Sequence, residues 1–246
     1  MLNSYRFLAE VYDSLMYDSD GEKWASYICG LLEKGGILPP ARILETACGT
    51  GRITLPLVRA GYDVVALDTS EEMLQTAQDK LRENALSAHF VCADMRDFSM
   101  PKPVSAIVSA CDGLNYLAEE GDAVRFFALC AENLMPGGML LFDISSYKKL
   151  TETIGNNVFF DDGDVVTCLW RNQISGDLLH MDLTLFVRED KLYRRMDEEH
   201  MQRAYHTKDV VQMLKDVGFT KIQSLSFLTA DEANEDDERI QFVAVR

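Results

Sequence analysis

Small or acidic residues stand at every second position between residues 45 and 51: Glu45, Ala47, Gly49 and Gly51. Two glycines this close together allow positive φ angles and leave room for a ligand to approach the backbone. The helix expected directly after them offers unpaired N–H groups, which favour an anionic group. The Glu45 carboxylate suits a ligand that carries an ammonium or sulfonium charge. The stretch therefore predicts a ligand site, and its acid argues against a pyrophosphate at that point.

A second acid, Asp68, ends the next apolar run, 17 residues after Gly51. In an open parallel sheet this is where a ribose diol would be held. The two stretches together indicate a cofactor that contains a nucleoside. A dinucleotide fingerprint, G-x-G-x-x-G/A, requires a third small residue, and Thr54 stands there instead. A nicotinamide-dependent oxidoreductase is therefore the less favoured alternative.

The elements around these residues alternate between apolar strands and amphipathic helices. We predict strands at 41–46, 63–68, 89–94, 104–110 and 139–144, helices at 52–60, 70–84 and 121–135, and a turn at 136–138. This alternation is typical of a parallel sheet that is covered on both faces. Because ligands bind beyond the carboxyl ends of such strands, Glu45 and Asp68 are expected at one edge of the sheet.

Other elements flank this core in the sequence. Helices are predicted at 3–16 and 21–34, before the first strand, and a helix at 207–216 with strands at 222–228 and 239–245 ends the chain. Between these parts, strands at 164–174, 178–187 and about 192–204 form an antiparallel meander. The second of these strands alternates apolar and polar residues with period two, which indicates a half-exposed strand.

The composition fits a globular protein with a negative surface. The chain has 246 residues, 47% of them hydrophobic, and its 24 basic against 40 acidic residues give a net charge of −16. Such a surface repels phosphate backbones, and no basic patch is visible, so no nucleic-acid partner is predicted. No signal peptide or membrane-spanning run is present, and a cytoplasmic protein without a membrane partner is expected.

The six cysteines occur singly in the sequence. They are expected to be reduced structural thiols, as is usual inside cells. None lies near a histidine at metal-ligand spacing, so no metal site is predicted.

At this point the sequence resembles the class I S-adenosylmethionine-dependent methyltransferases, over almost the whole chain. ILETACGTG looks like their first motif, VVALDTSEEML like the second and VCADMRDF like the adenine-edge motif, while AIVSACDGLNYL and ENLMPGGMLLFDI match the fourth and fifth strands. The resemblance implies an α/β fold with a doubly wound, Rossmann-like, mostly parallel seven-stranded sheet whose last strand is antiparallel, plus a small antiparallel β insert. It implies S-adenosyl-L-methionine as the cofactor.

The whole chain looks most like small-molecule members similar to glycine N-methyltransferases and sugar-amine N-methyltransferases. The shared features are AEVYD (9–13), the ADMRDF stretch and the insert. The implied reaction is methyl transfer to N or O of a small-molecule acceptor. Alternatives are a non-catalytic S-adenosylmethionine-binding or assembly protein and an RNA or protein methyltransferase. SACDGLNY, after the fourth strand, lacks a Pro-Pro-aromatic signature, which disfavours base methylation.

The resemblance implies a set of cofactor-binding residues: Tyr12, Glu45, Ala47, Cys48, Gly49, Gly51, Arg52, Asp68, Thr69, Met73, Asp94, Met95 and Ala110. Asp68 would hold the ribose, Met73 would lie against the adenine, and Asp94 would accept from its exocyclic amine. Arg52 pairs with the cofactor carboxylate or is an exposed surface arginine. Ala47 stands where the family usually has glycine, and an alanine fits there if its φ angle is negative.

On the acceptor side, Tyr12, Asp112 and Tyr116 are the candidates for positioning the acceptor. A general base helps only if the acceptor arrives protonated, and which residue would act is left open. His180 and His206 are either bases on the insert side or ordinary surface or packed histidines. Tyr12 is otherwise a core aromatic, as Trp24 is expected to be.

Three parts of the chain are predicted. Residues 1–36 form helices over the cofactor site, 37–154 and 206–246 form the methyltransferase core, and 155–205 form the antiparallel insert. The insert is either a lid, with Trp170, Arg171 or Tyr205 facing inward, or the contact sheet of a homodimer.

Overall fold

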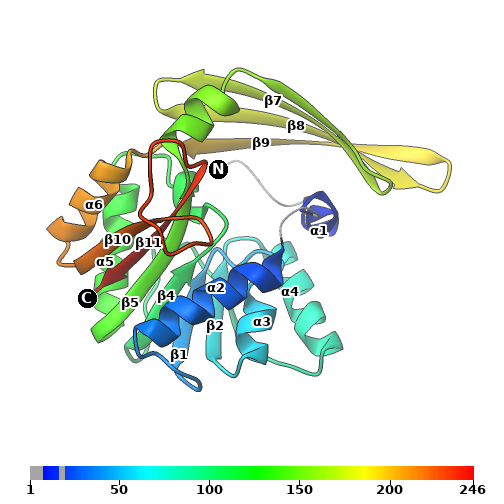
Figure 1. The fold of residues 1–246 in the computed structure, drawn as a ribbon. Helices are drawn as coiled ribbons and strands as arrows, with labels where there is room; N and C mark the ends of the chain where they lie inside the picture. Colours follow the sequence, from blue (N-terminus) through cyan, green and yellow to red (C-terminus); the bar gives the residue numbers. More distant parts are fainter. Residues whose placement is uncertain (1–7, 17–19) are drawn as a thin grey trace.

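A seven-stranded sheet forms the centre of the protein, seen in a computed structural model that describes residues 8–16 and 20–246 (Figure 1). Its order is β10-β11-β5-β4-β1-β2-β3. The strands are β1 (Arg42–Thr46), β2 (Asp63–Asp68), β3 (His89–Cys92), β4 (Val104–Ser109), β5 (Leu134–Ser145), β10 (Thr220–Ser226) and β11 (Arg239–Val245). Only β11 runs against its neighbours β5 and β10. The predicted Rossmann-like sheet with an antiparallel last strand is therefore confirmed.

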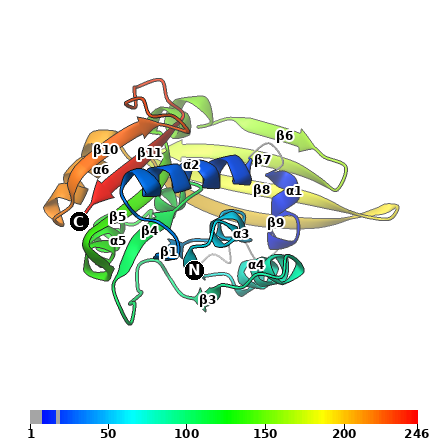
Figure 2. The ribbon, with the colours of Figure 1, turned by 60° about the horizontal axis from the view of Figure 1, so that its bottom comes forward.

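Helices cover both faces of this sheet (Figures 1 and 2). The helices are α2 (Gly21–Lys34), α3 (Thr54–Arg59), α4 (Glu71–Glu83), α5 (Asp122–Asn133) and α6 (Thr207–Asp216). Successive residues of a strand point to opposite faces. Ile43 accordingly packs with residues of α2, α3 and α4, whereas Leu44 packs with residues of α5 and α6. Because β1, β2 and β4 are buried on both faces, they read as nearly continuous apolar runs.

Local capping fixes where two helices begin. Ser70 precedes α4, and its hydroxyl accepts a hydrogen bond from the Met73 backbone N–H at 3.2 Å. Asp20 does the same for α2, accepting from the Lys23 N–H at 3.0 Å. Each cap satisfies an N–H group that has no partner within the helix. The cap of α4 thus fixes where this helix begins, directly after the acid that ends β2.

A second, antiparallel sheet lies beyond the carboxyl ends of the central strands (Figure 1). It consists of β6 (Val158–Asp162), β7 (Val166–Ser175), β8 (Leu178–Glu189) and β9 (Leu192–Arg203). The meander predicted from the sequence has three strands, and β6 is additional. This strand has only five residues, and its place comes from pairing with β7 and from contact between the Phe159 and Trp170 rings, 5.2 Å apart.

The N-terminal segment lies between the two sheets (Figures 1 and 2). In place of one helix over 3–16 there are a 3₁₀ turn, η1 (Leu8–Glu10), and a single helical turn, α1 (Tyr12–Leu15); residues 3–7 lie outside the described residues. Leu8 and Val11 are buried in a cluster with side chains of β7, β8 and β9. Packing against the second sheet thus overrides the helical periodicity. We call residues 8–16 the N-terminal strap.

The turn predicted at 136–138 is part of β5 instead. Val104 pairs with Leu134 but Ala106 pairs with Met139, so β5 carries extra residues opposite β4. Gly137 supplies the positive φ angle of this bulge, +78°. All six cysteines are free thiols, as expected. No helix in the described part of the chain is long and apolar enough to cross a membrane.

Candidate functional site

The turn between β1 and α3 is built around the two glycines. Gly49 and Gly51 have φ angles of +53° and +74°, a region that favours glycine. The Gly49 N–H donates to a carboxylate oxygen of Asp68 at 2.8 Å. The Cys48 N–H donates to the Leu67 carbonyl at 3.0 Å. The end of β2 therefore holds this glycine turn (residues 47–51) in place, and the two acids predicted to act together do lie at one edge of the sheet.

Glu45 is buried, with a relative exposure of 2%. Among the described residues its Oε2 atom has no hydrogen-bond partner. Burial raises the pKa of Glu45 to about 8; the Thr54 hydroxyl opposes the rise and the nearby Asp68 charge adds to it. A buried carboxyl oxygen without a partner is costly and calls for an explanation. A cationic group bound at the end of β1 would supply that partner.

Asp68 shapes the turn and still has capacity to accept hydrogen bonds. Its Oδ1 accepts from the Ser70 N–H at 3.0 Å and its Oδ2 from Gly49. Burial raises the pKa of Asp68, against the lowering effect of these backbone N–H groups. An ionised carboxylate can accept about four hydrogen bonds. Asp68 can therefore order the glycine turn and accept from a ligand hydroxyl at the same time.

Ala47 differs from the sequence expectation. Its φ angle is +52°, whereas an alanine was considered compatible with the turn only at negative φ. The Cβ atom of a non-glycine residue makes this region unfavourable by about 1–2 kcal/mol. Ala47 therefore occupies a glycine-type conformation with a side chain that strains it. The turn nevertheless keeps its shape because Asp68 and the Leu67 carbonyl hold its backbone.

Asp94 follows β3 and is engaged by Arg96. Its carboxylate accepts the Arg96 backbone N–H at 2.8 Å and pairs with the Arg96 guanidinium at 2.6 Å. Arg96 also contacts Asp122 of α5, at 3.0 Å. Hydrogen bonding to Arg96, against a smaller effect of burial, lowers the pKa of Asp94. The Asp94 carboxylate, which the sequence predicted to accept from the exocyclic amine of adenine, is thus also paired with Arg96.

The remaining residues predicted for the cofactor differ in exposure. Cys48, Met73, Met95 and Ala110 are buried, and Thr69 is exposed. The two methionines come from α4 and from the loop after β3, and Ala110 directly follows β4. The predicted set is therefore spread over the carboxyl ends of β1 to β4.

The N-terminal strap is fastened to the glycine turn by Asp13. Its carboxylate accepts from the Thr50 hydroxyl at 2.7 Å and pairs with Lys80 of α4 at 2.6 Å. Burial would raise the pKa of Asp13, but the Lys80 and Thr50 hydrogen bonds lower it. Arg52, 3.7 Å from the same carboxylate, donates to the Met16 carbonyl at 3.0 Å. In this state Arg52 holds the strap.

A second left-handed turn follows β4. Cys111 and Asp112 have φ angles of +64° and +50°. Their backbone N–H groups donate to the two carboxylate oxygens of Asp143, each at 2.9 Å. Asp143 lies on β5 and is fully buried. The carboxylate of a neighbouring strand therefore fixes the 111–116 segment, which continues into the 3₁₀ turn η2 (Gly113–Tyr116).

Arg239 joins the two acids of this turn. Its guanidinium lies 2.7 Å from Asp112 and also pairs with Asp143. Burial would raise the pKa of Asp112, but the charges of Arg239 and Lys149 lower it. For Asp143 the effect of burial prevails, and its pKa is raised. Gln202 of β9 donates to Asp112 at 2.8 Å, so the second sheet touches this network directly.

The predicted residues around the 111–116 segment have different outcomes. Tyr12 and Tyr116 are half-buried and lie close enough for charge on one to affect the other. Burial raises the pKa of Tyr12, with the charge of Cys111 adding to the rise and that of Arg52 opposing it. The Asn115 side chain is fully buried and bonds the carbonyls of Ser145 and Arg203.

Of the residues proposed on the second sheet and beside it, some are exposed and others are buried. His180 and His206 are exposed, and His206 stacks on Tyr147 at 3.7 Å between ring centroids. Arg171 is exposed and pairs with Asp182, so the expectation that it faces inward is wrong. The Tyr205 side chain is buried, and its hydroxyl donates to the Leu117 carbonyl. The Trp24 side chain is core, as expected, with Arg239 5.1 Å above its ring.

Several polar residues at this edge were missed: Asp143, Glu198, His200, Gln202 and Arg239. The three residues of this set that lie on β9 could have been found from the sequence. Glu198, His200 and Gln202 occupy alternate positions, the period that puts side chains on one face of a strand. Three polar residues on the face that continues from Met196 indicate a buried polar surface. Asp143 stands within an apolar run and Arg239 between an acidic run and an apolar one, with no local signal of their pairing.

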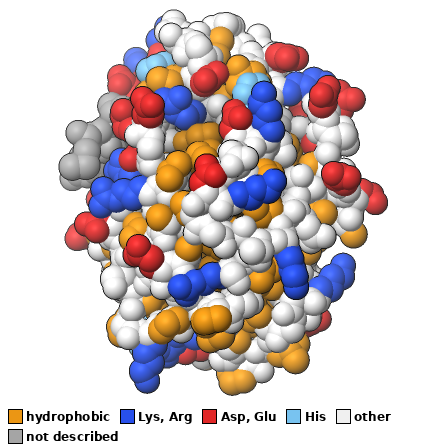
Figure 3. Space-filling view, turned by 90° about the vertical axis from the view of Figure 1, so that its left-hand side faces the viewer, with side chains coloured by type: hydrophobic (Ala, Val, Ile, Leu, Met, Phe, Trp, Pro, Cys, Tyr) orange, Lys and Arg blue, Asp and Glu red, His pale blue; other side chains and the backbone are white. Residues whose placement is uncertain are grey.

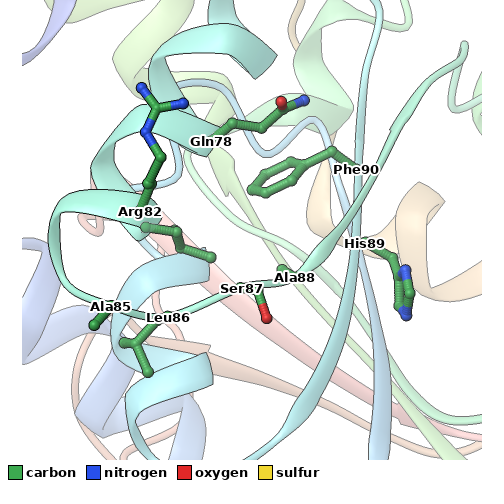
Figure 4. A pocket seen from close by; sticks show the side chains of 9 residues that line it. Gln78, Arg82, Ala85, Leu86, Ser87, Ala88, His89 and Phe90 are labelled. Carbon is green, nitrogen blue, oxygen red and sulfur yellow. The ribbon is translucent and has the colours of Figure 1, made fainter.

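A separate open hollow of about 550 Å³ lies between the end of α4 and the start of β3 (Figure 4). In Figure 4 the Phe90 ring turns toward the helix side that carries Gln78, while His89 points the other way. This hollow is at the amino end of β3. The acids described above are at the carboxyl ends of the strands, so the hollow is not part of this site.

Comparison with known proteins bears on this arrangement. Residues 43–138 match a protein-family profile described as a methyltransferase domain. A putative methyltransferase of Bacillus subtilis, YqeM, is 34% identical over 244 residues, covering 98% of this chain and 96% of that protein. An S-adenosylmethionine-dependent methyltransferase from Clostridium acetobutylicum has a solved structure with a TM-score of 0.90. It is 32% identical, with 99% of each chain covered.

A more distant relative has a named acceptor. The dTDP-3-amino-3,4,6-trideoxy-alpha-D-glucopyranose N,N-dimethyltransferase of Streptomyces venezuelae is 26% identical over 203 residues, which is 80% of this chain and 84% of that protein. The crystal structure of Streptomyces venezuelae DesVI, 24% identical and with a TM-score of 0.81, shares the fold over 96% of this chain and 97% of that one.

Proposed function

Because the chain belongs to the S-adenosylmethionine-dependent methyltransferases, we propose that it transfers the methyl group to nitrogen or oxygen of a small-molecule acceptor. The observation that carries this proposal is the cover over the 111–116 segment. Gln202 of β9 donates a hydrogen bond to Asp112, and Asp13 of the strap accepts one from Thr50 of the glycine turn. A site covered from two sides suits a small acceptor better than a polymer, which needs an open groove.

The cofactor fits the residues at the ends of β1 and β2. Glu45 has a buried oxygen that finds no partner within residues 8–16 and 20–246, which supports a role facing the cofactor's ammonium group. A side chain at Gly49 would meet no atom within 4 Å, so the backbone there is open to a ligand. We assign the ribose to Asp68 and the adenine to Met73, Asp94 and Met95. The cofactor supplies a methyl group activated by a sulfonium, and the chain aligns the acceptor and excludes water.

The remaining predicted residues are assigned by their place. Ala47, Cys48, Gly51 and Thr69 belong to the backbone that surrounds the cofactor, and Ala110 lies at its far side. Arg52 and Tyr12 stand where the strap meets the glycine turn, near the cofactor's carboxylate. Asp112 and Tyr116 position the acceptor.

The named acceptor of one relative and the charge of this chain both favour a small molecule. That relative is named as an N,N-dimethyltransferase of an amino sugar nucleotide. This chain carries a net charge of −16. On the face shown in Figure 3, lysines and arginines are interspersed with acids and do not gather into a patch. An RNA acceptor would meet electrostatic repulsion over such a surface.

A screen of acceptors tests this proposal. The purified chain is incubated with S-adenosylmethionine and a panel of amino sugars, amino acids, hydroxylated and carboxylated metabolites, total RNA and a protein extract. Release of S-adenosylhomocysteine is measured, with Asp68→Ala as the control for contaminating activity. We expect release with one class of small molecule. Release only with RNA or protein would contradict the proposal, and absence of release with every sample would favour a binding protein.

A further inference from the structure

The inner face of β9 carries three buried polar side chains next to the 111–116 segment. Glu198, His200 and Gln202 have relative exposures of 5%, 4% and 4%. Gln202 is used by Asp112. Glu198 and His200 contact each other, and this pair offsets the cost of burying them. A purely structural strand would carry apolar residues at these positions, as it does at Met196.

We propose that Tyr116, His200 and Glu198 form a proton relay that removes a proton from the methyl acceptor. This inference rests on the proposed function, since it concerns acceptors that arrive with a proton to lose. In it, Tyr116 is the catalytic residue that contacts the acceptor. His200 acts through Tyr116 by receiving the proton, and Glu198 is a positioning residue that orients His200.

The contacts of Glu198 set the order of the relay. Its Oε2 lies 3.1 Å from the His200 Nε2, and its Oε1 accepts from the Leu8 backbone N–H at 2.8 Å. The side chains of His200 and Glu198 are only 2% and 1% exposed. The carboxylate is thus held at both oxygens, one of them by the N-terminal strap. A carboxylate fixed in this way orients the imidazole that it contacts.

This pairing determines which ring nitrogen accepts a proton. A carboxylate accepts hydrogen bonds, so Nε2 carries the hydrogen in the neutral ring. Nδ1 is then the acceptor nitrogen, and it lies 3.5 Å from the Tyr116 hydroxyl. The two rings meet edge to face, with centroids 6.0 Å apart. Catalytic hydrogen bonds are often this long before the reacting molecule binds.

Tyr116 connects the relay with both turns of the site. It ends η2, directly after β4, and its neighbours include Tyr12 of the strap. Tyr12 in turn lies near Asp112 and Arg52. Among the described residues, His200 contacts two titratable groups, Glu198 on its own strand and Tyr116 on η2. The Tyr116 hydroxyl therefore lies at the end of the 111–116 segment, next to His200 of β9.

The proton transfer is balanced. The bond between the acceptor's nitrogen or oxygen and its hydrogen breaks, and that proton goes to the Tyr116 oxygen. The proton of the Tyr116 hydroxyl passes to His200 Nδ1. The tyrosine ends neutral, the imidazole becomes an imidazolium stabilised by Glu198, and the acceptor keeps the electron pair that attacks the methyl group. Water takes the proton from His200 after the reaction.

The alternative is a structural role, in which Glu198 and His200 merely fasten the strap to β9. Both roles keep the Glu198 contact with Nε2, so the protonation of the ring tests the geometry on which the relay depends, and the kinetics below separate the relay from a structural role. In ¹H–¹⁵N correlation spectra of the full chain labelled on its histidines, with S-adenosylhomocysteine present, the relay requires the Nε2–H form of His200. Loss of its signals in His200→Gln assigns them. A His200 that carries its hydrogen on Nδ1 would overturn the proposal, whatever the activity of the enzyme.

Kinetics with an acceptor found in the screen provide the second test. His200→Gln keeps an amide that can donate to Glu198 but removes the base. We expect kcat to fall about 100-fold to 10,000-fold in Tyr116→Phe and His200→Gln, and about 10-fold to 100-fold in Glu198→Gln, with KM changed less than about fivefold. His180→Gln, on the exposed face of β8, is the matched control and should leave kcat within about twofold.

The outcomes separate the relay from the proposed function. If the screen yields no small-molecule acceptor, the proposed function fails and the relay that rests on it fails too, whereas an Nδ1–H ring overturns the relay alone. If an acceptor is found and His200→Gln keeps kcat within about threefold, the relay is wrong and the function stands. S-adenosylhomocysteine affinity within about threefold of wild type shows that each variant is folded. The kinetics of a variant that fails this control are not used, and the ring protonation of His200 in the wild-type chain then tests the relay.

Discussion

Two turns in this protein follow parallel strands and enter the left-handed region, and they are held in different ways. The glycine turn after β1 places Gly49 and Gly51 at φ angles of +53° and +74°. The turn after β4 places Cys111 and Asp112 at +64° and +50°, with no glycine at either position. Glycine adopts such angles without strain, whereas other residues require about 1–2 kcal/mol each.

The second turn offsets that strain with contacts to distant parts of the chain. Both of its N–H groups bond Asp143, and Arg239 joins Asp143 to Asp112. The glycine turn needs only Asp68 and the Leu67 carbonyl, both within about 20 residues of it. The comparison teaches that the glycine turn is specified locally, whereas the turn after β4 depends on side chains roughly 30 to 130 residues away in the sequence.

Arg239→Met is expected to have the largest effect. It leaves Asp112 and Asp143 buried without their cation, which typically costs about 3–5 kcal/mol. Urea unfolding should show that loss of stability, while affinity for S-adenosylhomocysteine in the folded variant stays within about threefold. Arg171→Met is the matched control, because its pair with Asp182 is exposed and should contribute less than about 1 kcal/mol. If Arg239→Met lowers the free energy of unfolding by less than about 1 kcal/mol, the turn after β4 does not depend on this distant ion pair.

Asp68→Ala acts on the other turn. It removes the acceptor of the Gly49 and Ser70 N–H groups and the carboxylate assigned to the ribose. We expect affinity for S-adenosylhomocysteine to fall at least about 100-fold in calorimetry, or about 2.7 kcal/mol. Asp63→Ala, at the exposed start of the same strand, should bind like wild type. Equal affinity in the two variants would show that the site is elsewhere.

Glu45 gives the cofactor side a dependence on pH. Because burial raises its pKa to about 8 in the folded chain without cofactor, Glu45 keeps its proton there while the unfolded chain loses it near its ordinary value of about 4.5. Stability is thus full below that value and is lost as pH rises toward 8, by at most about 1.4 kcal/mol per pH unit. Glu45→Gln should remove this part of the slope in urea unfolding between pH 5 and 8. Identical slopes in the two proteins would contradict a buried, protonated Glu45.

Ala47→Gly is expected to have the smallest effect, and it stabilises. It relieves a φ angle of +52° at the cost of greater freedom in the unfolded chain, for a net gain of about 1 kcal/mol or less. Ala60→Gly is the control, because Ala60 has a φ angle of −71° and gains nothing from glycine. If both substitutions destabilise the chain equally, the glycine turn is not strained at Ala47.

The sequence predicted the central sheet and the cofactor side because their signals are local. Apolar runs, the Ser70 cap and the spacing of Glu45, Gly49, Gly51 and Asp68 all lie within short stretches. The condition set for Ala47 was wrong because the sequence does not reveal how much strain neighbouring hydrogen bonds can sustain. The helix predicted at 3–16 was also wrong as a single element, since the strap follows the surface of the second sheet.

The acceptor side could be predicted only in part. Asp112 and Tyr116 were identified by their place after a strand, but Asp143 and Arg239 were not, because nothing local distinguishes a buried ion pair from isolated charges in apolar strands. His180 and His206 were considered as bases, while the buried histidine of β9 is His200. The alternation of Glu198, His200 and Gln202 was a usable signal of one polar face on this strand. That this face lies toward the 111–116 segment became clear only from the position of the second sheet.

A crystal structure of the chain with S-adenosylhomocysteine tests the central claim most directly. The account predicts the nucleoside along the ends of β1 and β2, with its amino group at the Glu45 carboxyl and its ribose hydroxyls at Asp68. A nucleoside bound instead in the hollow between α4 and β3, with Glu45 still unpartnered, would contradict it.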